Sequence, residues 1–116
     1  MHEVSIAQSL IQILEDEMGQ FENAHLKSVR VRVGELSGVV PDALLFAFEV
    51  CSKGTVADGA VLHIEEVSAR GFCNVCKEEF QLEVPFLICP KCGTSDIEVL
   101  SGRELEIDNM DVENEE

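Results

Sequence analysis

The chain has 116 residues, enough for one ordinary domain or for a small domain that carries a still smaller metal-stabilised one. Its formal net charge of −15 argues against nucleic-acid binding, because that affinity comes largely from Lys and Arg neutralising phosphates. No segment approaches the roughly 20 apolar residues of a membrane-spanning helix, and no signal-peptide pattern opens the chain, so we expect a cytoplasmic protein.

The first half of the chain has the pattern of a helix, a strand and a second helix. A helix is predicted over residues 4–18 with Gly19 as its stop, and a strand is predicted over 28–36, where Val and Arg alternate. Pro41 suits the first turn of a second helix, which Gly54 ends. The helical spacing of the first segment places four apolar residues on one face: Ile6, Leu10, Ile13 and Leu14.

The second half of the chain is interrupted by a cysteine-rich segment over residues 71–97. A strand is predicted before it, over 60–67, and another after it, over 102–107. We expect these two strands to pair beneath the cysteine segment, which then reads as an insertion. The residues from Asp111 onward are acidic and are expected to be disordered. The order predicts an α+β fold with two helices and a three-stranded sheet.

Two Cys-x-x-Cys pairs, separated by twelve residues, predict a metal site. Each such turn aims two thiolates at one point, and two turns complete the tetrahedron that zinc prefers. Because thiolates fill every position and leave no place for water or substrate, we expect a structural zinc ion. Its predicted ligands are Cys73, Cys76, Cys89 and Cys92.

Two other chemistries compete with zinc at these cysteines. Disulfides are disfavoured in the reducing cytoplasm. Iron is an alternative, because Cys-Pro-x-Cys-Gly resembles the second cysteine turn of rubredoxins, but the surrounding aromatics are few: Phe72, Phe80 and Phe86. The fifth cysteine, Cys51, lies among apolar residues of the second helix and is expected to be a buried packing residue.

The chain begins Met1-His2-Glu3, which offers a second metal-binding pattern. A free terminal amine, the His2 amide nitrogen and the His2 imidazole can chelate one ion through fused rings, and planar nitrogen donation suits Ni(II) or Cu(II). Many chains begin Met-His by chance, so these residues alone do not establish a site. His25 is expected in a loop and His63 in a strand.

The combination of these motifs resembles the HypA family over essentially the whole chain apart from the acidic tail. The residues that carry the resemblance are the Met1-His2-Glu3 start, Val31 to Leu36, Val40-Pro41-Asp42 with Leu44 and Phe46 to Phe48, the two cysteine pairs, and Gly102-Arg103-Glu104-Leu105.

The resemblance implies a nickel metallochaperone for the maturation of nickel–iron hydrogenases, and not an enzyme. Such proteins work with a HypB-type GTPase and deliver Ni(II) to the hydrogenase large subunit, and some also serve urease maturation. The resemblance makes Met1, His2 and Glu3 the nickel-site residues and the four paired cysteines the zinc ligands. It implies a nickel-binding domain with an inserted, rubredoxin-like zinc ribbon. The expected parts are 1–68 for the first part of the nickel domain, 69–98 for the zinc ribbon, 99–110 for the returning strand and 111–116 for the tail.

Two other functional classes are weighed against nickel delivery. A zinc-ribbon adaptor that binds other proteins, without a second metal, is the alternative that the motifs leave open. An enzyme or a rubredoxin-like electron carrier is disfavoured, because the sequence offers no nucleophile–base pair, phosphate loop or open metal site. The fourth nickel donor is left open. The backbone or carboxylate of Glu3 is one candidate, but the other three donors leave it little in-plane freedom, so a partner protein or water is expected to complete the plane.

Overall fold

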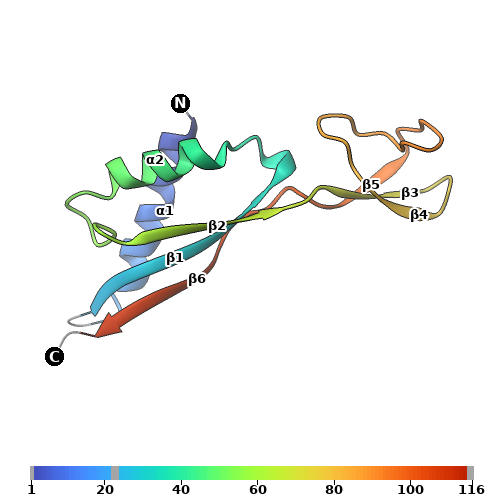
Figure 1. Cartoon of the computed structure of the whole chain (residues 1–116). Coiled ribbons are helices and arrows are strands. Elements are labelled where there is room, and N and C mark those ends of the chain that lie inside the picture. The colour runs from blue at the N-terminus through green and yellow to red at the C-terminus, as the bar shows by residue number, and fades with distance from the viewer. Residues whose placement is uncertain (1, 22–23, 115–116) are drawn as a thin grey trace.

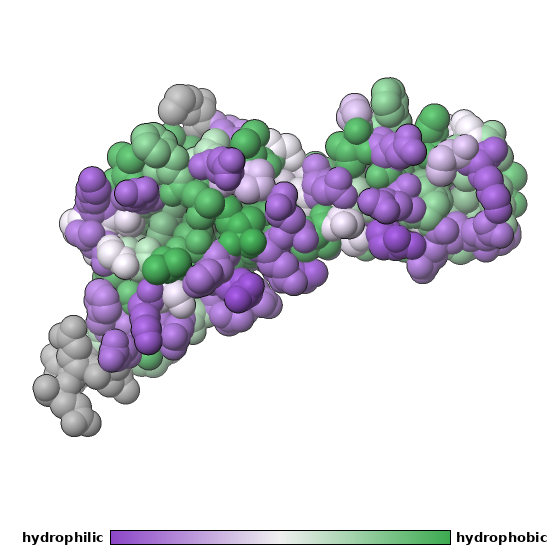
Figure 2. Space-filling model, viewed as in Figure 1, coloured by the Kyte–Doolittle hydropathy of each residue, from purple (hydrophilic) through white to green (hydrophobic). Residues whose placement is uncertain are grey.

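The computed structural model describes residues 2–21 and 24–114. The molecule is elongated, 60 × 26 × 17 Å, with a larger and a smaller lobe joined by a narrow waist (Figures 1 and 2). Neither helix in the described part of the chain has the length and apolar character needed to cross a bilayer. The elements, in order, are α1 (His2–Met18), β1 (Ala24–Gly34), a 3-10 turn (Glu35–Ser37), α2 (Pro41–Cys51), β2 (Val61–Val67), β3 (Arg70–Cys73), β4 (Glu78–Gln81), β5 (Ile97–Ser101) and β6 (Leu105–Asn114).

The larger lobe is a three-stranded sheet in the order β2-β1-β6, with both helices on one face (Figure 1). The central strand β1 runs parallel to β2 and antiparallel to β6. The expectation that residues 60–67 and 102–107 pair with each other is therefore wrong, because β1 lies between them. Four buried side chains make β1 the most buried strand of this sheet, and a strand flanked on both edges can bury them best. They are Leu26, Val29, Val31 and Val33.

Helix α1 packs against α2 and buries one row of side chains in the core. The buried positions are Ala7, Leu10, Ile11, Leu14 and Met18. The prediction that Ile13 belongs to this row is wrong, since Ile13 is 48% exposed, and Ile6 is only half-buried. Both lie about 100° around the helix from the buried row. This apolar flank of α1 therefore faces away from the centre of the core.

The smaller lobe, called here the cysteine module, is an antiparallel sheet in the order β4-β3-β5 with the cysteine turns at one end. Strand β5 pairs with β3, so this sheet continues to Ser101, beyond the boundary that the sequence suggested at residue 98. The two connections to the larger lobe are therefore short: residues 68–69 on one side and 102–104 on the other.

The two connections meet the end of β1 at a close-packed junction. The Leu36 N–H donates to the Gly102 carbonyl at 2.7 Å, and the Gly34 N–H donates to the Glu104 carbonyl at 2.7 Å. Glu35 accepts the N–H of fully buried Ala69 at 2.7 Å through Oε1. These bonds tie both connections to the strand that carries the core of the larger lobe.

Strands β1 and β6 are longer than the hydrophobic pattern suggested. Strand β1 begins at Ala24, so His25 lies in a strand and not in the expected loop. Strand β6 continues to Asn114, and Asp111 pairs with Ser28. The expectation of a disordered tail is therefore wrong for residues 111–114, and residues 115–116 lie outside the described part of the chain. Pairing with β1 gives the backbone N–H and C=O groups of this acidic segment hydrogen-bond partners, which keeps it in the sheet.

Candidate metal centres

The four paired cysteines come together at the end of the smaller sheet. Cys73 ends β3 and Cys76 follows in the next turn, while Cys89 and Cys92 approach from the loop before β5. All four sulfurs lie within 4.8 Å of one another, and the Cys73 and Cys92 Sγ atoms are 3.7 Å apart. Tetrahedral zinc–sulfur bonds of about 2.3 Å require sulfur–sulfur distances of about 3.8 Å. The donor set and its spacing therefore fit a zinc ion.

The two cysteine turns have the same backbone form. The Lys77 N–H donates to the Cys73 carbonyl and the Gly93 N–H donates to the Cys89 carbonyl, each at 2.8 Å. The residue after each pair is left-handed, with φ of 61° at Lys77 and 74° at Gly93. In the first turn the Cys76 N–H also donates to Cys73 Sγ at 3.2 Å. Each turn thus folds its amides toward the sulfurs, where they stabilise negative charge.

The crowding of the sulfurs separates the pKa values of two thiols. The backbone N–H of Cys92 holds the pKa of Cys89 at about 7. A hydrogen bond with the Cys92 thiol raises the pKa of Cys76 to about 12. A divalent cation that binds here must displace thiol protons, so its affinity increases with pH.

The remaining cysteine and two histidines lie outside this cluster. Cys51 is half-buried at the end of α2 and packs against the core of the larger lobe. His25 and His63 are exposed on β1 and β2. Within residues 2–21 and 24–114, only the four paired cysteines form a group of three or more side-chain ligands.

The N-terminal residues lie at the start of α1, next to the start of α2. Met1, predicted to supply the terminal amine, lies outside the described residues. The His2 side chain is 58% exposed, and its Nδ1 lies 3.5 Å from Glu3 Oε2. The same oxygen accepts the N–H of Val40 at 3.3 Å. That bond lowers the pKa of the Glu3 carboxyl, because it stabilises the charged form.

The Glu3 carboxylate, on α1, binds the backbone at the start of α2. Val40 is the residue before the first turn of α2, and an apolar side chain cannot accept a backbone N–H. The Glu3 carboxylate does not replace that acceptor; it accepts the N–H of Val40 itself, the bond that the Glu of a capping box makes from within its own helix. No sequence pattern reveals the contact, since it joins residues 37 positions apart. The neighbouring His2 imidazole stays exposed at this end of α1.

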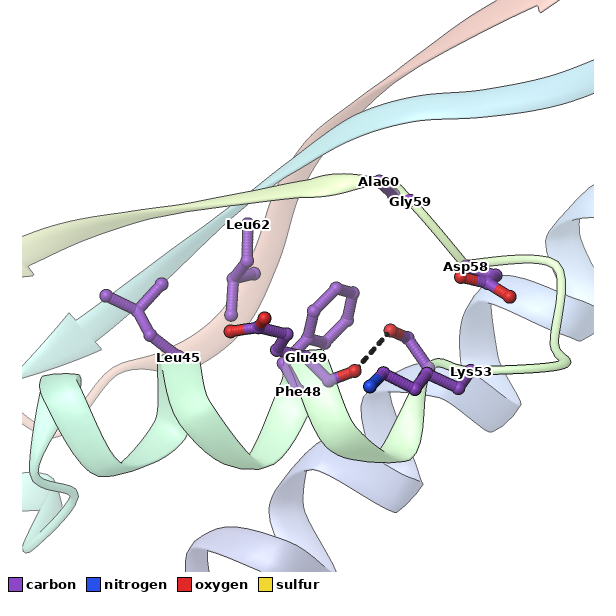
Figure 3. A pocket seen from close by; sticks show the side chains of 9 residues that line it. Leu45, Phe48, Glu49, Lys53, Asp58, Gly59, Ala60 and Leu62 are labelled. Carbon is purple, nitrogen blue, oxygen red and sulfur yellow. Dashed lines mark hydrogen bonds between the residues drawn. The ribbon is translucent and has the colours of Figure 1, made fainter.

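A cavity of 440 Å³ lies on the other side of α2, against the beginning of β2 (Figure 3). Apolar side chains line it together with the charged residues Glu49, Lys53 and Asp58. The Ser52 hydroxyl donates to the Glu49 carbonyl at 3.1 Å, the bond drawn in Figure 3. Of the described residues predicted to bind metal, none lines this cavity. Sequence reasoning did not anticipate it.

The fold and the cysteine cluster define a small metal-binding protein in which a cysteine module is inserted into an α+β domain. The sequence model of HypA, described as hydrogenase/urease nickel incorporation, metallochaperone, matches residues 1–112, and the chain belongs to this family. The expected family and the expected α+β fold are both confirmed.

Individual relatives agree over nearly the full length. Hydrogenase maturation factor HypA from Geotalea uraniireducens is 45% identical over 113 residues, covering 97% of this chain and 100% of the relative. A solution structure of a HypA protein is 25% identical, with a TM-score of 0.72 and coverage of 99% and 98%. The solution structure of the Ni metallochaperone HypA from Helicobacter pylori has a TM-score of 0.67 at 23% identity, covering 97% and 98%, and so supports the fold.

Proposed function

We propose that this chain binds Ni(II) at its N-terminus and delivers it to the large subunit of a nickel–iron hydrogenase during maturation. The observation that carries the proposal is the exposed His2 imidazole at the first residue of α1, in a chain of the HypA family. The ligands are the Met1 amine, the His2 amide nitrogen and the His2 imidazole. Planar nitrogen donors of this kind suit Ni(II).

Glu3 has a supporting role in this proposal. Its carboxylate is engaged by the Val40 N–H, so it fixes the first turn of α1 against α2 and holds His2 in place. Water or a partner protein supplies the fourth donor. An exposed site whose nitrogen ligands must lose protons binds reversibly, as delivery requires.

The four paired cysteines hold a structural zinc ion in this proposal. The sulfur spacing supports it, and thiolates occupy all four positions, so the ion shapes the cysteine module and does no chemistry on a substrate. The nickel domain then consists of residues 1–68 with the returning strand, and the zinc ribbon is the module inserted between them.

A HypB-type GTPase and the hydrogenase large subunit are the proposed partners, and urease maturation proteins are further candidates. The family description, which names both hydrogenase and urease, supports this set. We place the protein in the cytoplasm, where a reducing environment keeps thiolates available for zinc.

Nickel titration of tag-free, zinc-loaded protein tests the proposal. Wild type should bind one Ni(II) per chain with a planar, diamagnetic signature, and His2→Ala should abolish it. His25→Ala is the matched control, because it removes another exposed histidine of the same lobe. An added residue before Met1 should also abolish binding. Equal nickel affinity in wild type and His2→Ala would overturn the proposal and favour a zinc-ribbon adaptor without nickel transfer.

A further inference from the structure

A long apolar groove runs between α1 and the edge strand β6. Its first part, 330 Å³, begins at His2 and lies between the exposed flank of α1 and Leu105. Its second part, 320 Å³, lies between the same helix and Ile107, Asn109 and Met110. Ile13 lines both parts, so they adjoin at this side chain along the helix.

The groove exposes apolar surface that the fold leaves uncovered. Ile13 is 48% exposed and Leu105 is 40% exposed, and Ile6, Ile107 and Met110 are only half-buried. Ile107 and Met110 already pack against the core. The apolar core therefore extends to this edge of the sheet and is partly exposed to solvent there.

Strand β6 also offers backbone for pairing. The sheet order is β2-β1-β6, so within the described residues β6 has a strand neighbour on one side only. An unpaired edge of ten residues is a template for a further strand. The groove and the edge lie side by side, so one extended segment could use both at once.

The charges on β6 indicate which charge the bound segment should carry. Its apolar residues alternate with acidic ones that are exposed: Glu106, Asp108, Asp111 and Glu113. Glu106 is paired with Arg32, whereas no ion pair is formed by the other three within the described part of the chain. Figure 2 shows hydrophilic residues along this edge of the larger lobe. Oppositely charged residues that face each other on neighbouring strands attract, and like charges repel.

We propose that β6 and its groove bind an extended segment of a partner protein in which apolar and basic residues alternate. The segment adds a fourth strand to the sheet. Its apolar side chains enter the groove against Ile13, and its Lys or Arg side chains face Asp108, Asp111 and Glu113 on the opposite side. A second copy of this chain is disfavoured, because two β6 strands would bring their acidic rows together.

The groove begins at His2, so a bound segment ends beside the proposed nickel residue. That consequence rests on the proposed function, whereas the docking itself requires no nickel. A partner held in this way would bring its own acceptor ligands close to the cargo, which raises their effective concentration.

The test uses zinc-loaded, nickel-free full-length protein and a capped ten-residue peptide of alternating valine and lysine. Amide NMR shifts should map binding to β6 and the exposed flank of α1, and calorimetry should give the affinity. A valine–glutamate peptide of the same length should not bind. A valine–lysine peptide with alternate backbone nitrogens methylated should bind more weakly, because it cannot complete the strand ladder.

Two variants with matched controls test the groove and the charges separately. Ile13→Glu should weaken peptide binding, whereas Val50→Glu, at a similarly exposed apolar site on α2, should not. Asp111→Lys should weaken binding roughly two- to tenfold, since attraction becomes repulsion at one cross-strand pair. Glu66→Lys makes the same charge change on β2, the opposite edge strand, and should leave binding unchanged.

Several results would overturn the docking proposal. They are equal binding of the valine–glutamate peptide, shifts confined to β2, no response to either groove variant, or pairing of β6 between two copies in the absence of peptide. His2→Ala should still bind the peptide. A protein that binds the peptide but no nickel would refute the proposed function alone.

Discussion

Replacing Gly34 by Ala should strongly destabilise the protein, because the two lobes meet there without room for a methyl group. Gly34 has φ of −81° and ψ of 150°, a conformation that alanine adopts freely. Without a clash, the change should therefore stabilise the folded state by about 0.4–1 kcal/mol, because alanine reduces the conformational entropy of the unfolded chain. The added Cβ, however, would overlap the carbonyl of Gly102 and lie 2.7 Å from the Arg103 nitrogen. These are backbone atoms, so relief requires a shift of the connection itself.

The size of the effect follows from what that shift disrupts. The Gly34–Glu104 and Leu36–Gly102 hydrogen bonds cross the same contact. Their loss costs about 1 kcal/mol each, and overpacking costs about 1–3 kcal/mol more. After the favourable contribution is subtracted, the expected destabilisation is about 2–5 kcal/mol. That is a large share of the roughly 5–15 kcal/mol that stabilises a typical protein.

Urea unfolding of the zinc-loaded protein, followed by circular dichroism, measures this difference. The control is Gly19→Ala, where a Cβ would lie 3.4 Å from the Asp16 carbonyl oxygen and needs little adjustment. Its free energy of unfolding should equal that of wild type or exceed it by up to about 1 kcal/mol, because the same unfolded-chain effect acts there without a clash. If Gly34→Ala were as stable as Gly19→Ala, the close packing of the junction would be refuted.

Two further predictions concern the metal centres. Cys89→Ala should lose bound zinc and unfold the cysteine module while the helical signal remains, because zinc contributes on the order of 10 kcal/mol to such modules. The control Cys51→Ala, outside the cluster, should keep its zinc. Metal analysis together with circular dichroism distinguishes the two variants. For Glu3, the Val40 N–H lowers the folded-state pKa below 4.5, so the stabilisation is present above pH 4.5 and is lost as pH falls through the lowered value. The stability advantage of wild type over Glu3→Gln should therefore shrink in acid, and an NMR titration giving Glu3 an unshifted pKa would contradict this.

The cysteine cluster could be predicted because its geometry is local. Two ligands three residues apart on one turn must point to a common centre, whatever the rest of the chain does. Both helices were also predictable, since Pro41 and Gly19 mark their ends and apolar residues recur at helical spacing. The limits of β6 were not, because its acidic residues resemble a solvated tail until β1 pairs with them.

For His2 and Glu3, the proposed nickel residues, the sequence supplied one part of the description and the packing of the helices supplied the other. The sequence placed His2 and Glu3 at a chain end in the HypA pattern, but it did not show what the Glu3 carboxylate contacts. Packing of α1 against α2 brings that carboxylate to the Val40 N–H. The same packing leaves Ile13 outside the core, although its spacing along the helix is compatible with burial.

The sequence by itself determined the family, the α+β class and the four cysteines that cluster, because motifs and short-range periodicity depend on neighbours along the chain. Only the tertiary structure decided the strand order, the junction at Gly34 and Gly102, and the groove beside β6. Each of these joins segments that are distant in sequence. Their positions follow from how all the apolar surfaces are buried together, and no local pattern contains that information.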